Sequence, residues 1–120
     1  MKRKIFLVDD ETDLRLAISF KLRNAGYEVF EIVEGQEVLD RVRAVIPDLI
    51  ILDIFLPGMN GDKVAKILKN DENLKSIPII LISAFSESLK EKFEECGADS
   101  YLAKPFASAE LVSMIKKHIG

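Results

Sequence analysis

Residues 49–53, Leu-Ile-Ile-Leu-Asp, decide the fold class of this chain, because four apolar side chains lead without a break into a carboxylate. Residues 5–8 (Ile-Phe-Leu-Val) lead in the same way into two aspartates, and residues 79–82 (Ile-Ile-Leu-Ile) lead into a serine. Apolar runs of this length without strict alternation are typical of strands buried on both faces of a parallel sheet. Ligands bind at the carboxyl ends of such strands, so these polar groups are expected to meet at one edge of the sheet.

Strand-like and helix-like segments alternate five times along the chain. The expected strands cover residues 4–9, 28–32, 48–53, 77–82 and 99–103, and the expected helices cover residues 12–25, 35–45, 61–71, 86–96 and 107–118. This alternation predicts right-handed crossovers and an α/β fold in which helices cover both faces of a parallel sheet. No linker, repeat or low-complexity segment interrupts it, so residues 1–120 are expected to form one domain.

Charge and composition narrow the class of protein. The net charge of −3 argues against a nucleic-acid surface, which would carry clustered basic groups. No apolar stretch approaches the ~20 residues of a membrane span. The single cysteine, Cys96, cannot form an internal disulfide, which fits a reducing compartment. We therefore expect a cytoplasmic protein that binds neither nucleic acid directly nor a membrane.

The strand ends present an electrostatic problem. Asp9, Asp10 and Asp53 would repel one another, since like charges about 4 Å apart cost about 4 kcal/mol at an effective dielectric of ~20. Lys104, after the last expected strand, supplies only one positive charge. Oxygen ligands with an open site suit Mg²⁺. An aspartate beside Mg²⁺ and a lysine is well placed to attack a phosphorus centre and become an aspartyl phosphate.

With these residues the chain resembles the receiver domain of two-component response regulators, in its single-domain form, as in chemotaxis regulators. The matching motifs are Asp9-Asp10, Asp53 within LIILDIFLPGMNG, Ser83-Ala84 and Lys104-Pro105-Phe106. The resemblance covers the whole chain and implies a flavodoxin-like fold with a five-stranded parallel sheet of order 2-1-3-4-5. It also implies a signalling switch that assists its own phosphorylation and dephosphorylation, and not an enzyme acting on other substrates.

The resemblance implies a role for each residue of the acidic edge. Asp53 would be the phosphoacceptor and would take a phosphoryl group from the phosphohistidine of a sensor histidine kinase or a histidine phosphotransfer protein. Mg²⁺ would be held by Asp53, by Asp10 directly, by Asp9 mainly through water, and by the backbone carbonyl of Phe55.

The resemblance also implies how phosphorylation would be sensed. Ser83 and Lys104 would bind phosphoryl oxygens, and Lys104-Pro105 would be a cis peptide. The ring of Tyr101 would turn inward as Ser83 moves toward the phosphate. A downstream protein target would read the surface formed by the fourth helix, fifth strand and fifth helix.

Simpler structural interpretations stand beside these roles. Either aspartate of the first strand could cap the following helix, and Asp53 could begin a turn. Ser83 is small and polar at a strand end, and Lys104 could be a solvated loop lysine. Tyr101 is a β-favouring aromatic residue that could simply pack. His118 has no evident partner and is expected to be solvated.

The chain departs from the common pattern of the resembled family at Phe55 and Phe85, positions that in the family flank the phosphoryl group and influence attack by water. Each lies two residues beyond a strand-end residue of the acidic edge, and both are large and apolar. One interpretation is packing within the loops. The other is restricted access of water to the aspartyl phosphate, which would lengthen its lifetime.

The first expected helix carries apolar residues on two faces. One stripe, expected to face the sheet, is formed by Leu14, Ile18, Leu22 and Ala25. Leu16 and Phe20 lie on another face, where a helix is ordinarily polar. Burial under a neighbouring segment is one explanation for this pair, and docking of a kinase helix pair is the other.

Three alternatives stand beside the prediction that this chain is a complete, single-domain response regulator. The chain could be a receiver domain cut from a larger transcription factor or hybrid kinase. A haloacid-dehalogenase-like phosphatase would need a second aspartate two residues after its nucleophile, where this chain has Phe55. A flavin-binding electron carrier would need a hydroxyl- and glycine-rich loop for phosphate after the first strand, where residues 9–13 are mostly acidic.

Overall fold

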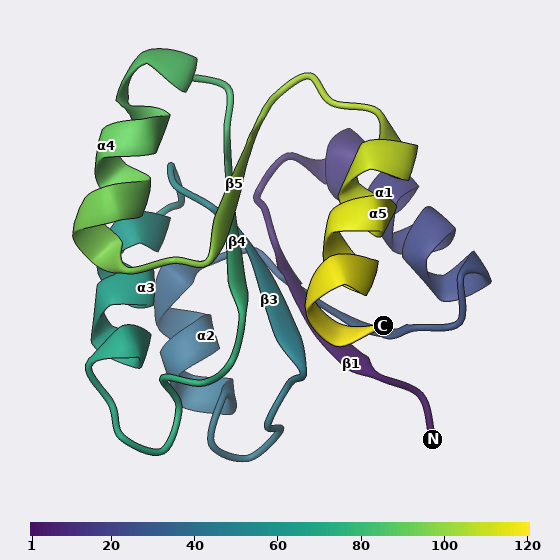
Figure 1. Cartoon of the computed structure of the whole chain (residues 1–120), viewed down its shortest axis with the longest axis horizontal. Coiled ribbons are helices and arrows are strands. Elements are labelled where there is room, and N and C mark those ends of the chain that lie inside the picture. Colours follow the sequence, from purple (N-terminus) through teal and green to yellow (C-terminus); the bar gives the residue numbers. More distant parts are fainter.

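The computed structural model describes residues 1–120 as a five-stranded parallel sheet between two layers of helices (Figure 1). The strands are β1 (Lys4–Val8), β2 (Glu28–Ile32), β3 (Leu49–Asp53), β4 (Ile79–Ser83) and β5 (Ser100–Ala103). The helices are α1 (Thr12–Asn24), α2 (Gly35–Arg41), α3 (Gly61–Lys69), α4 (Ser86–Cys96) and α5 (Ser108–Ile119). The strand order is β2-β1-β3-β4-β5, which confirms the predicted flavodoxin-like topology.

The apolar strand runs are explained by burial on both faces of the sheet. In β1, Phe6 and Val8 belong to the core beneath α2, α3 and α4, whereas Ile5 and Leu7 belong to the core beneath α1 and α5. All residues of β3, the central strand, and of its neighbour β4 are buried. A strand covered on both sides needs apolar side chains at every position, so the usual polar alternation is lost.

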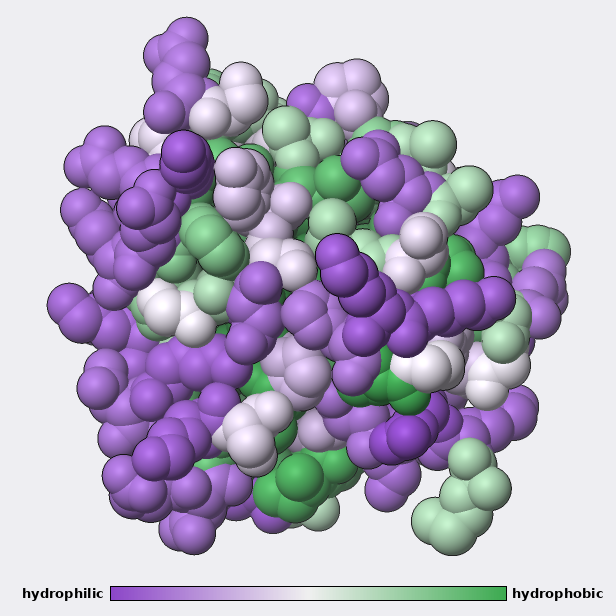
Figure 2. All heavy atoms as spheres, viewed as in Figure 1, coloured by the Kyte–Doolittle hydropathy of each residue, from purple (hydrophilic) through white to green (hydrophobic).

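Polar side chains are confined largely to the outside of the helices. Figure 2 shows hydrophilic side chains over most of one face, densest over α3 and α4. None of the helices combines the length and the apolar character needed to cross a bilayer.

Three helices end earlier than the sequence predicts, α1 by a single residue, at Asn24 instead of residue 25. α2 ends at Arg41 instead of residue 45, and turns follow it. Three of residues 42–46 are β-branched, and residue 46 precedes Pro47, which disfavours helical backbone geometry. α3 ends at Lys69 instead of residue 71.

The two apolar faces of α1 have different surroundings. Ile18 and Leu22 are buried against the sheet and Leu14 is partly buried, but Ala25 lies beyond the helix end and is exposed, so its predicted burial is wrong. Leu16 and Phe20 are 52% and 57% exposed, so no neighbouring segment buries this pair.

Candidate functional site

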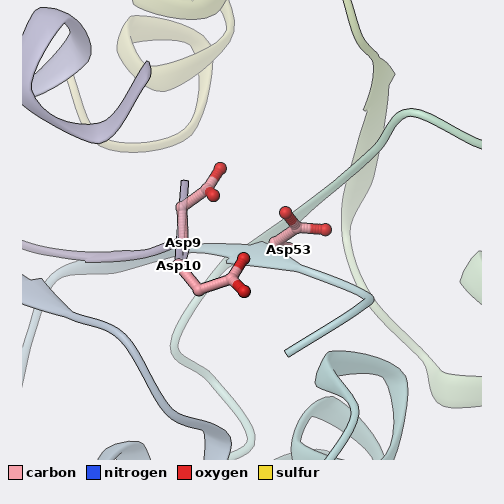
Figure 3. Close-up of side chains that lie close together, drawn as sticks. All are labelled: Asp9, Asp10 and Asp53. Atoms are coloured by element: carbon pink, nitrogen blue, oxygen red, sulfur yellow. The ribbon is translucent and has the colours of Figure 1, made fainter. Parts of the chain in front are cut away.

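The structure brings three carboxylates together at the carboxyl edge of the sheet. Asp9 and Asp10 directly follow β1, Asp53 is the last residue of β3, and these two strands are neighbours. Each aspartate offers an oxygen within 4.8 Å of the others, and Figure 3 shows their carboxylates around a common space. Asp9 and Asp53 are buried, whereas Asp10 is exposed. We call these three residues the acidic cluster.

Lys104 is the cation nearest the acidic cluster. Its Nζ lies 2.8 Å from Asp53 Oδ2 and 2.9 Å from Asp9 Oδ2, and only 11% of its side chain is exposed. Its backbone N–H donates to the carbonyl of Ser83 at 2.8 Å, which fixes the start of the loop after β5. The Lys104-Pro105 peptide is cis, as predicted. Sequence reasoning missed Glu11, whose Oε1 lies 3.5 Å from the same Nζ.

Burial and charge shift the protonation equilibria of this pair. Burial raises the pKa of Asp53 above its usual value; Lys104 offsets part of this rise, and the charge of Asp9 adds to it. Burial alone would lower the pKa of Lys104, but its hydrogen bond to Asp53 and its close ion pairs with Asp53 and Asp9 outweigh burial and raise that pKa. Lys104 is therefore charged at neutral pH.

The donor set of the acidic cluster fits Mg²⁺. Asp9 Oδ1 accepts a hydrogen bond from the backbone N–H of Glu11 at 2.8 Å. Asp9 Oδ2 is buried and, although it is ion-paired with Lys104, receives no hydrogen bond of acceptable geometry. The carboxylate of Asp10 accepts no hydrogen bond, so open oxygens remain on two of the three aspartates. All the side-chain ligands are carboxylate oxygens, and one of them is buried without a hydrogen bond. Such a site suits a hard cation that keeps part of its water shell.

Ser83 and Tyr101 lie on the neighbouring strands β4 and β5. Ser83, the last residue of β4, is fully buried, and its Oγ accepts a hydrogen bond from the backbone N–H of Phe85 at 3.0 Å. Its hydroxyl proton therefore remains available to another acceptor. Tyr101 on β5 is 38% exposed, and its ring centroid lies 4.8 Å from that of Phe93 on α4. Packing against α4 thus accounts for the position of the Tyr101 ring.

Phe55 and Phe85 contact each other across the site. Their ring centroids are 5.0 Å apart with planes at 74°, an edge-to-face arrangement. The side chains are 41% and 62% exposed, so the two rings pack mainly on each other and not into the core. The backbone N–H of Phe55 also donates to Asp53 Oδ1 at 3.2 Å. The loops that follow β3 and β4 therefore meet beside Asp53.

Two groups of polar residues were not anticipated from the sequence. The prediction for His118 is wrong: it is half-buried, and its Nε2 lies 2.7 Å from the Oγ of Ser100. Arg15 on α1 donates from Nη1 to the carbonyl oxygen of Asp9 at 3.1 Å and forms an ion pair with Glu31 on β2. Local pattern gives no sign of either contact, because the partners are far apart in the chain.

Comparison with known proteins identifies the family. A family model described as the response regulator receiver domain matches residues 5–116. The DNA-binding response regulator MtrA of Mycolicibacterium paratuberculosis is 35% identical over 120 residues, which are 99% of this chain and 52% of MtrA. The chain thus spans about half the length of this curated relative.

Two solved structures share the fold and contain magnesium. The receiver domain of the sensor histidine kinase PA1611 from Pseudomonas aeruginosa PAO1, with a magnesium ion in its active-site cleft, is 30% identical with a TM-score of 0.90, covering 100% of this chain and 99% of that one. The response regulator TrrA from Thermotoga maritima, in complex with Mg²⁺-BeF, is 33% identical with a TM-score of 0.87, covering 98% and 99%.

These findings agree with the strand order and with the acidic cluster. The family consists of signalling switches that interact with histidine kinases. This chain belongs to the response regulator receiver domain family of two-component systems.

Proposed function

We propose that residues 1–120 form one receiver domain in which Asp53 accepts a phosphoryl group from the phosphohistidine of a sensor histidine kinase or a histidine phosphotransfer protein, in a reaction that requires Mg²⁺. The observation that carries this proposal is the position of Asp53 at the end of β3, with Lys104 Nζ at 2.8 Å and the other two carboxylates within 4.8 Å.

The chemistry is a phosphoryl transfer between side chains. A carboxylate oxygen of Asp53 attacks phosphorus, the phosphorus–nitrogen bond breaks, and its electron pair returns to the imidazole nitrogen of the donor. The product on this chain is an acyl phosphate. Lys104 is charged and within hydrogen-bond distance of Asp53, so it can offset negative charge on the transferred group. Mg²⁺ held by Asp9, Asp10, Asp53 and the Phe55 carbonyl would supply the remaining positive charge.

Ser83 and Tyr101 would convert phosphorylation into a change of surface. The hydroxyl proton of Ser83 is free to bind a phosphoryl oxygen, and moving Ser83 would strain its hydrogen bond to the backbone N–H of Phe85. Since that bond fixes the residue before α4, and Tyr101 packs on Phe93 of α4, both residues connect the site to one helix. Two packings of α4 and β5 would then be biased by the phosphate.

The central test uses a small phosphodonor. With acetyl phosphate and Mg²⁺, the parent protein is expected to gain one acid-labile phosphoryl group, detected by intact mass. Asp53→Asn keeps the size of the side chain but removes the attacking oxygen's charge, and should gain none. Chelation of Mg²⁺ should abolish the gain in the parent. A label that persists in Asp53→Asn would place the acceptor elsewhere.

Phe55 and Phe85 would limit the access of water to the acyl phosphate. Their edge-to-face contact closes the two loops beside Asp53 with apolar surface. Phe55→Asn and Phe85→Glu are each expected to shorten the half-life of the phosphorylated protein, measured by loss of the phosphoryl mass after the donor is removed. Unchanged half-lives in both variants would exclude this role.

Leu16 and Phe20 would dock the kinase helix pair. Phe20→Ala should slow phosphotransfer from a phosphorylated kinase and leave the reaction with acetyl phosphate unchanged. Ile67 is an exposed apolar residue of α3, in the opposite helical layer, so Ile67→Ala is the matched control. Equal phosphotransfer rates for the parent and Phe20→Ala would remove the docking role.

The output would be a protein contact. Because the net charge is −3, we propose that this domain does not bind nucleic acid itself. We place the reaction in the cytoplasm, where the buried Cys96 would remain a free thiol.

A further inference from the structure

Asp9 is held at nearly every polar atom. Its backbone N–H donates to the carbonyl of Ile32 at the end of β2, at 3.0 Å. Its Oδ1 accepts from the N–H of Glu11 at 2.8 Å, and its carbonyl oxygen accepts from Nη1 of Arg15 at 3.1 Å. Only Oδ2 receives no hydrogen bond. The orientation of Asp9 is therefore set by the contacts to its backbone and to Oδ1.

The contact from Arg15 reaches two members of the acidic cluster. The carbonyl of Asp9 belongs to the peptide bond that joins Asp9 to Asp10. That peptide is planar, so a hydrogen bond that fixes its carbonyl also fixes the direction in which both residues leave it. One guanidinium nitrogen thus restrains the backbone of two carboxylates.

Glu31 on β2 holds the guanidinium of Arg15 in place. Its Oε1 lies 3.1 Å from Nε of Arg15, and the two side chains are only 23% and 14% exposed. Its Oε2 accepts from Ser19 Oγ and from Arg23 Nη1, both at 3.3 Å. Both oxygens of Glu31 are therefore occupied, and Arg15 presents Nε to Glu31 and Nη1 to Asp9 at the same time.

We infer that Arg15 is a positioning residue for the Mg²⁺ site, oriented by Glu31, and that it acts by fixing the Asp9-Asp10 peptide. The inference rests on the proposed function, because it requires the acidic cluster to bind Mg²⁺. The rigid fork of an arginine is needed for this task, since a lysine has a single nitrogen and cannot donate to both partners with the same geometry.

Positioning and simple charge predict opposite effects of removing Arg15. Loss of a positive charge near the cluster would strengthen the binding of a cation if long-range electrostatics were its only role. Loss of a positioning contact weakens binding, because the two carboxylates would have to be ordered when the metal arrives. The sign of the change in Mg²⁺ affinity therefore separates the two roles.

The experiment compares Arg15→Met with Arg23→Met. Both variants lose one positive charge and one contact with Glu31, but Arg23 makes no contact with Asp9 and instead donates to the carbonyl of Val29. The Kd of Mg²⁺ is measured by isothermal titration calorimetry without any phosphodonor. Arg15→Met is expected to raise the Kd about tenfold or more, the usual cost of losing a contact that orients a metal ligand. Arg23→Met should leave the Kd unchanged or lower it.

Thermal unfolding without Mg²⁺ establishes whether each variant is folded. If Arg15→Met is not folded, Arg15→Lys replaces it in the comparison. Arg15→Lys should also weaken Mg²⁺ binding despite its retained charge. Binding by the Arg15 variant that equals or exceeds that of the parent would overturn the inference and leave the proposed function intact. If Arg23→Met weakened Mg²⁺ binding as much as Arg15→Met, the inference would also be overturned, because the packing of α1 on β2 would then explain the loss of affinity. A parent protein that binds no Mg²⁺ would overturn both.

Discussion

Removing Lys104 should destabilise the protein in a way that Mg²⁺ can reverse. Lys104→Met keeps a flexible apolar stem but leaves Asp9 and Asp53 as unpaired buried carboxylates beside each other. The Nζ distances of 2.8 and 2.9 Å correspond to a gross attraction of about 6 kcal/mol for each pair at an effective dielectric of ~20. Desolvation of the charges cancels much of this, and breaking one partner of a buried pair costs about 3–5 kcal/mol net.

The expected loss in Mg²⁺-free buffer is therefore about 3 kcal/mol or more, which lowers the melting temperature of a chain of this size by about 10 °C. Mg²⁺ should restore stability, because it supplies positive charge to the same carboxylates. At a concentration 100 times its Kd, a ligand that binds only the folded state adds about 2.7 kcal/mol. Lys104 also competes with Mg²⁺ for Asp9 and Asp53, so at a given Mg²⁺ concentration the variant should gain more stability than the parent.

Lys69→Met is the matched control. Lys69 is as buried as Lys104, with 13% of its side chain exposed, and its Nζ lies 2.7 Å from Asp99 Oδ2. It lies at the end of α3 and pairs with no member of the acidic cluster. The assay is urea denaturation at pH 7.5 with and without Mg²⁺. If Mg²⁺ stabilises Lys104→Met no more than it stabilises the parent or Lys69→Met, the conclusion that Lys104 and Mg²⁺ neutralise the same carboxylates is wrong.

Three further predictions concern single residues. The pKa of Asp53 is higher in the folded state than in the unfolded state, so the folded protein holds this proton more tightly. Without Mg²⁺, the free energy of unfolding should therefore fall as pH rises from the ordinary carboxyl pKa of 3.8 through the raised pKa of the folded state. Urea denaturation over a pH series should show this fall in the parent and not in Asp53→Asn. Gly61→Ala would place a Cβ 2.0 Å from the carbonyl oxygen of Asp53 and should cost about 1–3 kcal/mol in the same denaturation assay, with slower phosphorylation by acetyl phosphate. Cys96 is buried and burial raises its pKa, so a thiol reagent should modify it only at the rate of unfolding, measured with and without urea.

The fold could be predicted because the strands that decide it are recognisable from short stretches of sequence. A strand covered on both faces must be apolar throughout, and β3 and β4 are buried at every position. The polar residue that ends each run then marks the carboxyl edge, where parallel strands bring their ends together. The acidic cluster followed from these two facts before any distance was known. The end of α2 could not be predicted in this way, because turns before Pro47 replace the last residues of the predicted helix.

The second polar layer could not be predicted in the same way. Arg15, Ser19 and Arg23 are spaced four residues apart on α1, which from the sequence alone reads as an ordinary solvated face. In the structure this line meets Glu31 on β2, and Ser19 is buried there. His118 was missed for the same reason: its partner Ser100 lies on another element. A row of polar residues on a helix can be identified as buried only when the residues that it contacts on other elements are known.

The same contacts keep two of the three carboxylates in place despite their mutual repulsion. Repulsion would ordinarily turn such side chains apart, but Asp9 is fixed through its backbone and Oδ1, and Asp53 is held by Lys104 and by the N–H of Phe55. Asp10 alone is exposed and accepts no hydrogen bond, so its side chain is the least restrained of the three. Binding of Mg²⁺ then has to order mainly this one side chain. A site in which two of three ligands are ordered in advance loses less conformational entropy on binding, and this is the advantage that the contact from Arg15 to Asp9 provides.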